Sequence, residues 1–260
     1  MLTAYDAPTA ELLESADVDV ILVGDSVGMV LLGYDSTVPV TMDEMIHHAK
    51  AVRRGAKKTF MIGDLPLKGV EKGPHQTLES ARRFVREAGC QAVKLEWNTH
   101  CLESTRLLVW NGIPVMGHMG LTPQSASSEG GFKVRAQKAE EAQALLGKAL
   151  AFEKAGVFSI LLECVPSPVA ELLTKRLKVP TFGIGAGPHC DGQVLVFQDV
   201  VGTFKKFRPR FVKAYADTDG LMRKAVSRFI REVRSGAFPG KKHSFAMKKE
   251  ELTEFLRKVR

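Results

Sequence analysis

The sequence predicts an α/β fold in which eight parallel strands and the helices between them form a (β/α)8 barrel. Eight short apolar runs recur along the chain, and segments with apolar residues three and four positions apart separate most of them. Strands that alternate with helices in this way are parallel and are joined by right-handed crossovers. The length of 260 residues suits one such barrel. An open, doubly wound sheet is the alternative, but we favour the barrel because ionisable residues follow many of the strands.

The predicted strands are short and rich in β-branched residues, which is typical of strands buried on both faces. The clearest is Val18–Gly24, which delivers Asp25 and Ser26 at its carboxyl end. The last strand is the least distinct. In chain order the strands are Leu2–Ala4, Val18–Gly24, Thr59–Gly63, Ala92–Leu95, Ile113–Gly117, Phe158–Leu162, Val179–Ile184 and Val194–Phe197.

The segments between these strands carry the period of amphipathic helices, and most end at a glycine, the residue favoured just past a helix end. The clearest are Met42–Arg54, Gln76–Ala88, Cys101–Trp110, Glu140–Ala155 and Pro168–Leu177. Another stripe, Leu252, Phe255, Leu256 and Val259, recurs at helical spacing near the end of the chain. We therefore predict a barrel over residues 1–245 and an amphipathic helical extension over residues 246–260. The apolar stripe of that extension requires a surface on this chain or on a neighbouring subunit.

Composition and cysteine content place the protein in a broad class. The chain is 45% hydrophobic and 25% charged, as in ordinary globular enzymes. No apolar run approaches the roughly 20 residues that span a bilayer, and Met1–Asp6 has no feature of a signal peptide. The four cysteines include no C-x-x-C pair. We interpret them as reduced thiols and expect a cytoplasmic protein.

The net charge of +8 is unevenly distributed. Residues 203–260 contain 17 Lys and Arg against 6 Asp and Glu. A basic tail of this kind can bind a nucleic acid or another polyanion. However, its charges alternate with apolar residues at helical spacing, as in residues 221–230, so we favour solvated helix faces.

Two glycine-rich segments suggest loops near a ligand. Gly183–Gly187 follows a strand but lacks the G-x-G-x-x-G register and has no clear helix after it, so dinucleotide binding is not favoured. We expect it to let the backbone approach a ligand at the barrel mouth. The pair Gly130-Gly131 indicates a candidate lid within Leu121–Arg135.

Acidic residues follow three successive predicted strands. Asp25, Asp64 and Glu96 stand at carboxyl ends, which in a barrel meet at one mouth. There they would repel one another unless a cation neutralised them. Oxygen ligands favour Mg²⁺ or Mn²⁺ over zinc. Any one of these acids could instead cap a helix or pair with a nearby base.

Three further ionisable residues complete the candidate site. Lys94 lies two positions before Glu96, so both side chains point to one face. Lys94 could simply be the ion partner of Glu96, and His118 alone would more often be structural. Together with a metal that chelates a 2-oxo acid, however, Lys94 could bind the acid's carboxylate and Glu163 could move a proton.

Short sequence motifs that follow one another in the same order from Thr3 to Phe245 resemble those of the ketopantoate hydroxymethyltransferase family, the 3-methyl-2-oxobutanoate hydroxymethyltransferases. The most specific are VGDSVGM at Val23–Met29 and GHMGLTPQS at Gly117–Ser125. The others are Thr3–Asp6, Asp35–Thr41, Val52–Ala56, Asp64–Pro66, Val93–Glu96, Leu162–Pro166, Gly183–Gly187, Asp191–Gln193, Pro239–Gly240 and His243–Phe245.

The resemblance implies a TIM barrel of the phosphoenolpyruvate/pyruvate type and a one-carbon transferase of the class II aldolase kind. It implies transfer of a hydroxymethyl group from 5,10-methylenetetrahydrofolate to 3-methyl-2-oxobutanoate through a Mg-stabilised enolate. The product is 2-dehydropantoate, formed in the first committed step of pantothenate synthesis. It also implies a homo-oligomer, often a decamer, with no nucleic acid or membrane as partner.

The resemblance also implies roles for individual residues. Mg²⁺ is the expected metal, with Mn²⁺ or Co²⁺ as alternatives, while the residues that bind the folate are not implied. The expected metal ligands are Asp25, Asp64 and Glu96; the expected substrate-binding residues are Asp25, Ser26, Asp64, Lys94 and His118; and the expected catalytic proton acceptor or donor is Glu163. Trp97 stands where the family commonly has glycine, and we expect it to reshape the rim of the pocket.

Two other functions stay open from the sequence. One is a different Mg-dependent 2-oxo acid lyase or mutase on the same barrel, which would need no folate. The other is a polyanion-binding protein that uses the basic tail, whose binding would weaken steeply with salt. A subsidiary hypothesis is that basic residues of the tail attract the polyglutamate chain of the folate.

Overall fold

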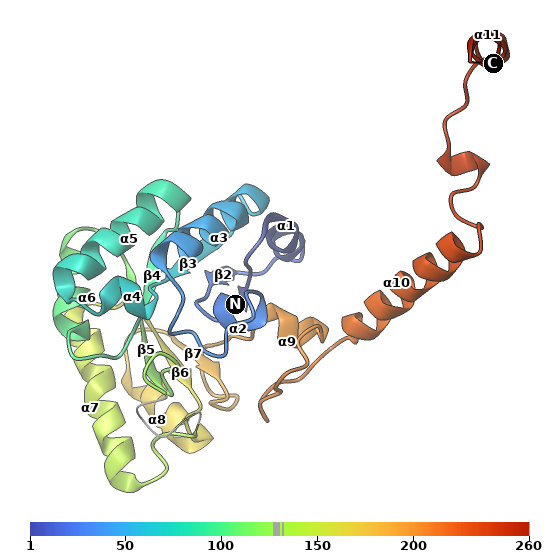
Figure 1. Cartoon of the computed structure of the whole chain (residues 1–260). Helices are drawn as coiled ribbons and strands as arrows, with labels where there is room; N and C mark the ends of the chain where they lie inside the picture. The colour runs from blue at the N-terminus through green and yellow to red at the C-terminus, as the bar shows by residue number, and fades with distance from the viewer. Residues whose placement is uncertain (127–130, 132, 260) are drawn as a thin grey trace.

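The computed structural model describes residues 1–126, 131 and 133–259. Its centre is one sheet of eight parallel strands that follow one another in chain order, surrounded by helices (Figure 1). The strands are β1 (Leu2–Thr3), β2 (Val20–Val23), β3 (Phe60–Asp64), β4 (Ala92–Glu96), β5 (Val115–Gly120), β6 (Ser159–Glu163), β7 (Thr181–Ile184) and β8 (Gly192–Gln193). A parallel bridge between Leu2 and Leu195 returns the chain after β8 to β1 and closes the barrel. The predicted barrel is therefore confirmed.

The helices begin and end where local chemistry favours it. Thr41 and Glu44 form a capping box at the start of α3, and Gly89 and Gly156 adopt left-handed backbone at the ends of α5 and α7. The helices are α1 (Ala7–Ser15), α2 (Val27–Val30), α3 (Met42–Gly55), α4 (Leu67–Val70), α5 (Pro74–Ala88), α6 (Cys101–Trp110), α7 (Ala139–Ala155), α8 (Ser167–Arg176), α9 (Phe197–Val201), α10 (Thr218–Arg234), the 3-10 helix η1 (Lys241–His243) and α11 (Lys249–Lys258).

The eighth strand is the one that the sequence placed wrongly. It pairs with β7 at Gly192 and Gln193, ahead of the apolar run Val194–Phe197. That run crosses the barrel end toward β1, where the N–H of Phe197 donates to the hydroxyl of Thr3 at 3.0 Å. Phe197 then starts α9. The run nevertheless continues the pairing of the last strand, because the N–H of Val194 donates to the carbonyl of Gly183 on β7 at 3.0 Å and Leu195 forms the bridge to β1.

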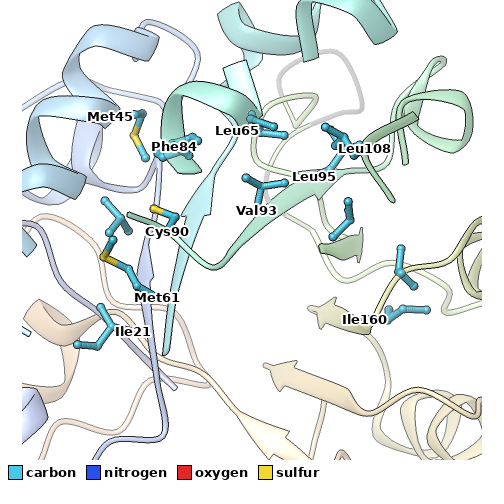
Figure 2. Close-up of a cluster of buried hydrophobic side chains, with 14 of the residues drawn as sticks. Ile21, Met45, Met61, Leu65, Phe84, Cys90, Val93, Leu95, Leu108 and Ile160 are labelled. Atoms are coloured by element: carbon cyan, nitrogen blue, oxygen red, sulfur yellow. The ribbon is translucent and has the colours of Figure 1, made fainter. Parts of the chain in front are cut away.

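The hydrophobic core has two parts. The larger lies between the sheet and the helices, and Figure 2 shows the strand residues Ile21, Met61 and Val93 in the same cluster as Met45 and Phe84 of α3 and α5. The smaller fills the barrel interior and consists of Leu22, Ile62, Ala92, Met116, Leu161 and Val194. This packed interior ends below the strand carboxyl ends, which leaves those ends free to build a site.

The C-terminal part of the chain leaves the barrel (Figure 1). α10 and α11 have no buried residue, although both carry an apolar stripe. On α10 the stripe includes Met222, Val226, Phe229 and Val233, all at least 46% exposed. The helix predicted near the end of the chain is present as α11. The division at residue 245 stays a prediction.

Two other sequence expectations concern membrane-spanning segments and a lid over the site. None of the helices in the described residues is long and apolar enough to cross a membrane. Of the Gly130-Gly131 pair expected to mark a lid, Gly130 lies outside the described residues.

Candidate active site

All seven residues predicted from the strand ends line one cavity of about 360 Å³ at the carboxyl ends of the strands. Asp25 and Ser26 follow β2, Asp64 ends β3, and Glu163 ends β6. The remaining three are Lys94, Glu96 and His118, on β4 and β5. Parallel strands of a barrel expose their carboxyl ends at one face, so residues up to 138 positions apart in the sequence converge there.

Lys94 is the central cation of the site. Its ammonium lies 2.7 Å from Oδ1 of Asp64 and 3.8 Å from Oε1 of Glu96. Burial alone would lower the pKa of Lys94, but the carboxylates of Asp64, Glu96 and Asp25 outweigh it and raise the pKa of the ammonium. Lys94 therefore carries a positive charge at the bottom of the cavity.

Asp25 and Asp64 lie close together with only part of their charge balanced. The N–H of Asp25 donates to Oδ2 of Asp64 at 3.0 Å. Burial raises the pKa of Asp25 well above its usual value, and the neighbouring Asp64 raises it further. Lys94 contacts Asp64 directly, so Asp25 is left as the carboxylate that gains most from another cation.

His118 lies between two carboxylates. Its Nδ1 is 3.3 Å from Oε1 of Glu96, and its Nε2 is 3.1 Å from Oε2 of Glu163. Burial and Lys94 lower the pKa of His118, but Glu163 and Glu96 outweigh them and raise it. In turn, burial would raise the pKa of Glu96, and His118 and Lys94 lower it. The imidazole predicted to bind substrate thus links Glu96 to Glu163.

Several of these contacts are ion pairs without well-directed hydrogen bonds. Oδ1 of Asp64, Oε1 of Glu96 and Nε2 of His118 are buried and have no hydrogen-bond partner of good geometry among the described residues. Most buried polar atoms in proteins have such partners. Atoms of this kind at the bottom of a cavity are poised to bind a ligand or an ion.

Gln124 is a site residue that the sequence reasoning missed. Its side-chain amide donates to Oδ2 of Asp25 at 2.8 Å and to the carbonyl of Leu65 at 2.9 Å. Its backbone N–H donates to Oε2 of Glu96 at 3.2 Å. The residue lies within Gly117–Ser125, but a glutamine in a loop gives no local sign of burial. Its contacts with two acids of different strands become visible only in the fold.

Tyr5 is the second residue that was missed. Its hydroxyl lies 2.8 Å from Oγ of Ser26, and its ring is fully buried. Burial raises the pKa of Tyr5, so the phenol stays protonated and can hold the Ser26 hydroxyl in place. From the sequence, an aromatic residue after the first strand indicates only a side chain of the hydrophobic core.

The donor set fits a hard divalent cation, although the side chains are paired with one another here. Among the described residues, no group of three or more His, Cys, Asp or Glu side chains is arranged to hold a metal ion. Asp64 faces Lys94 and Glu96 faces His118 instead. The fit rests on the all-oxygen chemistry of the buried carboxylates and on the close approach of Asp25 to Asp64.

One expectation about the pocket rim is wrong, and another stays a prediction. Trp97 does not line the cavity; its ring packs nearly perpendicular to that of Phe152, at 5.0 Å, and beneath the ammonium of Lys148. At Gly185, in the turn after β7, the ring of Phe211 packs against the backbone, while the neighbouring Ile184 lines the cavity, so the expected approach of this segment to a ligand stays a prediction. A Cβ on Gly185 would lie 2.7 Å from that ring.

A closed barrel of eight parallel strands with acids, a lysine and a histidine at its carboxyl ends defines a TIM-barrel enzyme. Solved structures of the same fold include 2,3-dimethylmalate lyase, described as a member of the PEP mutase/isocitrate lyase superfamily, with 15% identity and a TM-score of 0.57 over 100% of this chain and 93% of that one. Phosphoenolpyruvate phosphomutase from Streptomyces platensis subsp. rosaceus has 17% identity and a TM-score of 0.59 over 100% and 94%. At such identities the likeness shows the fold alone.

The sequence comparisons show the family. The sequence model for ketopantoate hydroxymethyltransferase matches residues 1–241. The 3-methyl-2-oxobutanoate hydroxymethyltransferase of Heliobacterium modesticaldum is 52% identical over 96% of this chain and 91% of its own length. That of Thermus thermophilus is 54% identical over 94% and 93%. The chain belongs to the ketopantoate hydroxymethyltransferase family and is a transferase.

Proposed function

We propose that the protein transfers a hydroxymethyl group from 5,10-methylenetetrahydrofolate to 3-methyl-2-oxobutanoate and forms 2-dehydropantoate, the first committed step of pantothenate and coenzyme A synthesis. The observation that carries this proposal is the contact of His118 with Glu163 in the same cavity as the Lys94 ammonium. The site thus offers a carboxylate base beside a fixed positive charge. The relatives' shared name supports the identity of the substrates.

Lys94 and Ser26 are suited to bind the oxo acid. The Lys94 ammonium is a charged donor for the substrate carboxylate, and charge-assisted hydrogen bonds of this kind are strong in a buried site. Ser26 offers a hydroxyl whose position is fixed by Tyr5. The apolar side chains of Leu22 and Leu161 line the same cavity and suit the branched carbon chain.

Glu163 is suited to take the proton from C3 of the oxo acid. Its side chain is 16% exposed, so it can reach a ligand in the cavity, and His118 at 3.1 Å holds its orientation. The electron pair left at C3 attacks the methylene carbon of the folate and forms the new C–C bond. The methylene carbon is held by two C–N bonds: the first breaks as the C–C bond forms, and water displaces the nitrogen of the second and supplies the oxygen of the hydroxymethyl group. Both nitrogens are protonated as tetrahydrofolate leaves.

Asp25, Asp64 and Glu96 would hold the divalent cation, with Mg²⁺ as the proposed ion and Mn²⁺ or Co²⁺ as alternatives. When bound, the ion would supply Lewis-acid stabilisation of the negative charge that develops on the keto oxygen. Gln124 contacts two of these carboxylates and would keep them in place. The site would lose its ion if any of the three acids were replaced.

We also propose that the protein is a homo-oligomer, as other members of the family are expected to be. The exposed stripes of α10 and α11 support this, because an apolar helix face extended into water requires a covering surface. A second copy of the chain presents the same stripes and is the proposed partner. The four free cysteines suit the cytoplasm, where we place the protein.

The test follows the C3 proton of 3-methyl-2-oxobutanoate by NMR in D₂O, with and without Mg²⁺ and without folate. Metal-dependent loss of the C3 signal, followed by product formation when 5,10-methylenetetrahydrofolate is added, supports the proposal. Exchange without transfer would favour a different oxo acid reaction on this barrel. No exchange and no transfer, with folate present, would contradict the proposed function.

A further inference from the structure

The segment after α9 forms a closed loop beside the active site. Gly202, with φ of 75°, turns the chain against the backbone of Ala216, and the N–H of Tyr215 donates to the carbonyl of Val200 at 2.8 Å. The loop therefore leaves and returns at one point, as compact surface loops do. We call residues 203–215 the rim loop.

The rim loop places aromatic side chains over the cavity that contains Glu163. Phe204, Phe207 and Phe211 all line that cavity. Phe211 packs on Gly185, which fixes the loop to the turn after β7. Phe207 is 60% exposed. An exposed phenyl ring at the mouth of an active-site cavity is an apolar surface on which a flat ligand can stack.

Two cations accompany these rings. Arg210 of the rim loop and Lys133, from the segment after β5, line the same cavity, and neither forms an ion pair with any other described residue. By contrast, Lys205 is occupied by Asp217 at 2.8 Å. Asp199 is an acid of the same mouth, and its charge interacts with that of Arg208. The mouth thus keeps two cations available for an anionic ligand.

The cavity therefore has an inner and an outer half of different chemistry. The inner half holds Lys94, His118 and the acids, which suit a small oxo acid. The outer half offers phenyl rings and free cations, which suit an aromatic ring that continues into carboxylates. A small branched oxo acid has no such group, whereas the p-aminobenzoylglutamate arm of a folate has both.

We infer that Phe204, Phe207, Arg210 and Lys133 form the subsite for the p-aminobenzoylglutamate arm of the folate co-substrate. This inference rests on the proposed function and adds the location of its second substrate. The aromatic ring packs on the phenylalanines, and the glutamate carboxylates pair with Arg210 and Lys133. The one-carbon unit then points inward to the carbon activated by Glu163.

The experiment compares Arg210→Ala, Lys133→Ala and Phe207→Ala with Lys206→Ala. Lys206 is a matched control because it is an exposed cation of the same loop that does not line the cavity. For Arg210→Ala we expect the KM for 5,10-methylenetetrahydrofolate to rise about tenfold, the loss typical of one charge-assisted contact. The KM for the oxo acid and the folate-free exchange of its C3 proton should change less than about twofold, the scatter left when no contact is lost. Lys206→Ala should match the wild type in all three.

A second readout uses the length of the glutamate chain. The triglutamate form of the folate should bind more tightly than the monoglutamate form to the wild type, and this preference should shrink in Lys133→Ala and Arg210→Ala. Equal folate KM values for the three variants, the control and the wild type, with C3 exchange intact, would overturn the inference and leave the proposed function standing. A change in sedimentation without a change in folate KM would also overturn it, because the rim loop would then be a subunit contact. Absence of C3 exchange and of transfer in the wild type would instead reject the proposed function.

Discussion

Nε2 of His118 lies 3.1 Å from Oε2 of Glu163, while Nδ1 of the same ring faces Glu96 at 3.3 Å. One imidazole therefore joins the proposed base to one of the proposed metal ligands. A histidine in ion-pair contact with two acids is held in one orientation, and it holds both acids in turn. The chemistry of the site should depend on this ring even if the ring never touches the substrate.

Replacement of Glu163 by Gln should remove the base and keep the shape of the site. We expect the exchange rate of the C3 proton to fall by about 10²–10⁴, the usual contribution of a positioned general base. The dissociation constant of the oxo acid should change little. NMR in D₂O measures the exchange rate, and calorimetric titration measures the dissociation constant. Glu171→Gln on α8 is the surface control, and an exchange rate in Glu163→Gln equal to that of the control would remove Glu163 from the mechanism.

Replacement of His118 by Gln should act through Glu163. The single variant should slow C3 exchange. The double variant with Glu163→Gln should slow it far less than the product of the two single effects, because both substitutions disrupt the same His118–Glu163 pair. Rates from the four proteins of this double-mutant cycle give the coupling directly. Independent, additive losses would show that His118 acts elsewhere.

His118 should also make the stability of the metal-free protein depend on pH. The pKa of His118 is raised in the folded state, so its contribution to stability is fully present below the unfolded pKa, near 6.5. That contribution is lost as the pH rises through the higher folded pKa. The difference in unfolding free energy between wild type and His118→Gln should therefore be larger at pH 5.5 than at pH 9, as urea unfolding with EDTA can measure. A difference that does not change with pH would contradict this.

Asp25→Asn should stabilise the metal-free protein while removing its response to metal. The pKa of Asp25 is raised in the folded state, so its contribution to stability is present below the unfolded pKa and is lost as the pH rises, and at neutral pH the burial of this carboxyl group costs stability. With EDTA we expect the variant to melt about 2–4 °C higher, the shift that about 1 kcal/mol gives at this chain length. Millimolar Mg²⁺ should raise the melting temperature of the wild type and not that of Asp25→Asn. A variant that still responds to Mg²⁺ would exclude Asp25 from the metal site.

Gln124→Ala should lower both stability and activity. It removes the donor to Asp25 and leaves the buried carbonyl of Leu65 without its side-chain partner, which costs about 1–3 kcal/mol. Gln76→Ala on α5 loses a solvent-exposed side-chain bond to the carbonyl of Lys68 and serves as the control. Urea unfolding and the transfer rate should separate the two variants. Equal losses of unfolding free energy and of transfer rate in the two variants would show that the buried contacts of Gln124 stabilise the site no more than an exposed hydrogen bond does.

Phe229→Asp should weaken self-association. The side chain lies in the apolar stripe of α10 and is 54% exposed, so a charge there opposes burial against another subunit without disturbing the barrel core. Lys224→Glu lies on the opposite face of α10 and is the matched control. Sedimentation velocity should show a smaller assembly for Phe229→Asp only. An unchanged assembly would mean that the stripe is not a subunit contact.

The residues that the sequence could locate are those at strand ends. Lys94 and Glu96 share a face because strand side chains alternate, and Asp64 and Glu163 end strands whose apolar runs are plain in the sequence. The roles of Gln124, Tyr5 and the rim loop could not be predicted from the sequence, because they depend on the tertiary position of a loop or of a buried ring. The same limit explains the wrong expectations for Trp97 and for the bounds of the last strand. An apolar residue indicates that a position is buried, but it does not indicate which residues pack against it.

The bridge from Leu2 to Leu195 has a consequence for how the protein is made. β1 is synthesised before every other strand of the barrel, yet its second neighbour is almost two hundred residues further along the chain. At about 5–20 residues per second, the ribosome needs roughly 10–40 s to deliver that neighbour. During this interval the nascent sheet has an open edge that can pair with other chains. Anything that covers the free edge of β1 during this interval favours closure of the barrel over pairing with another chain.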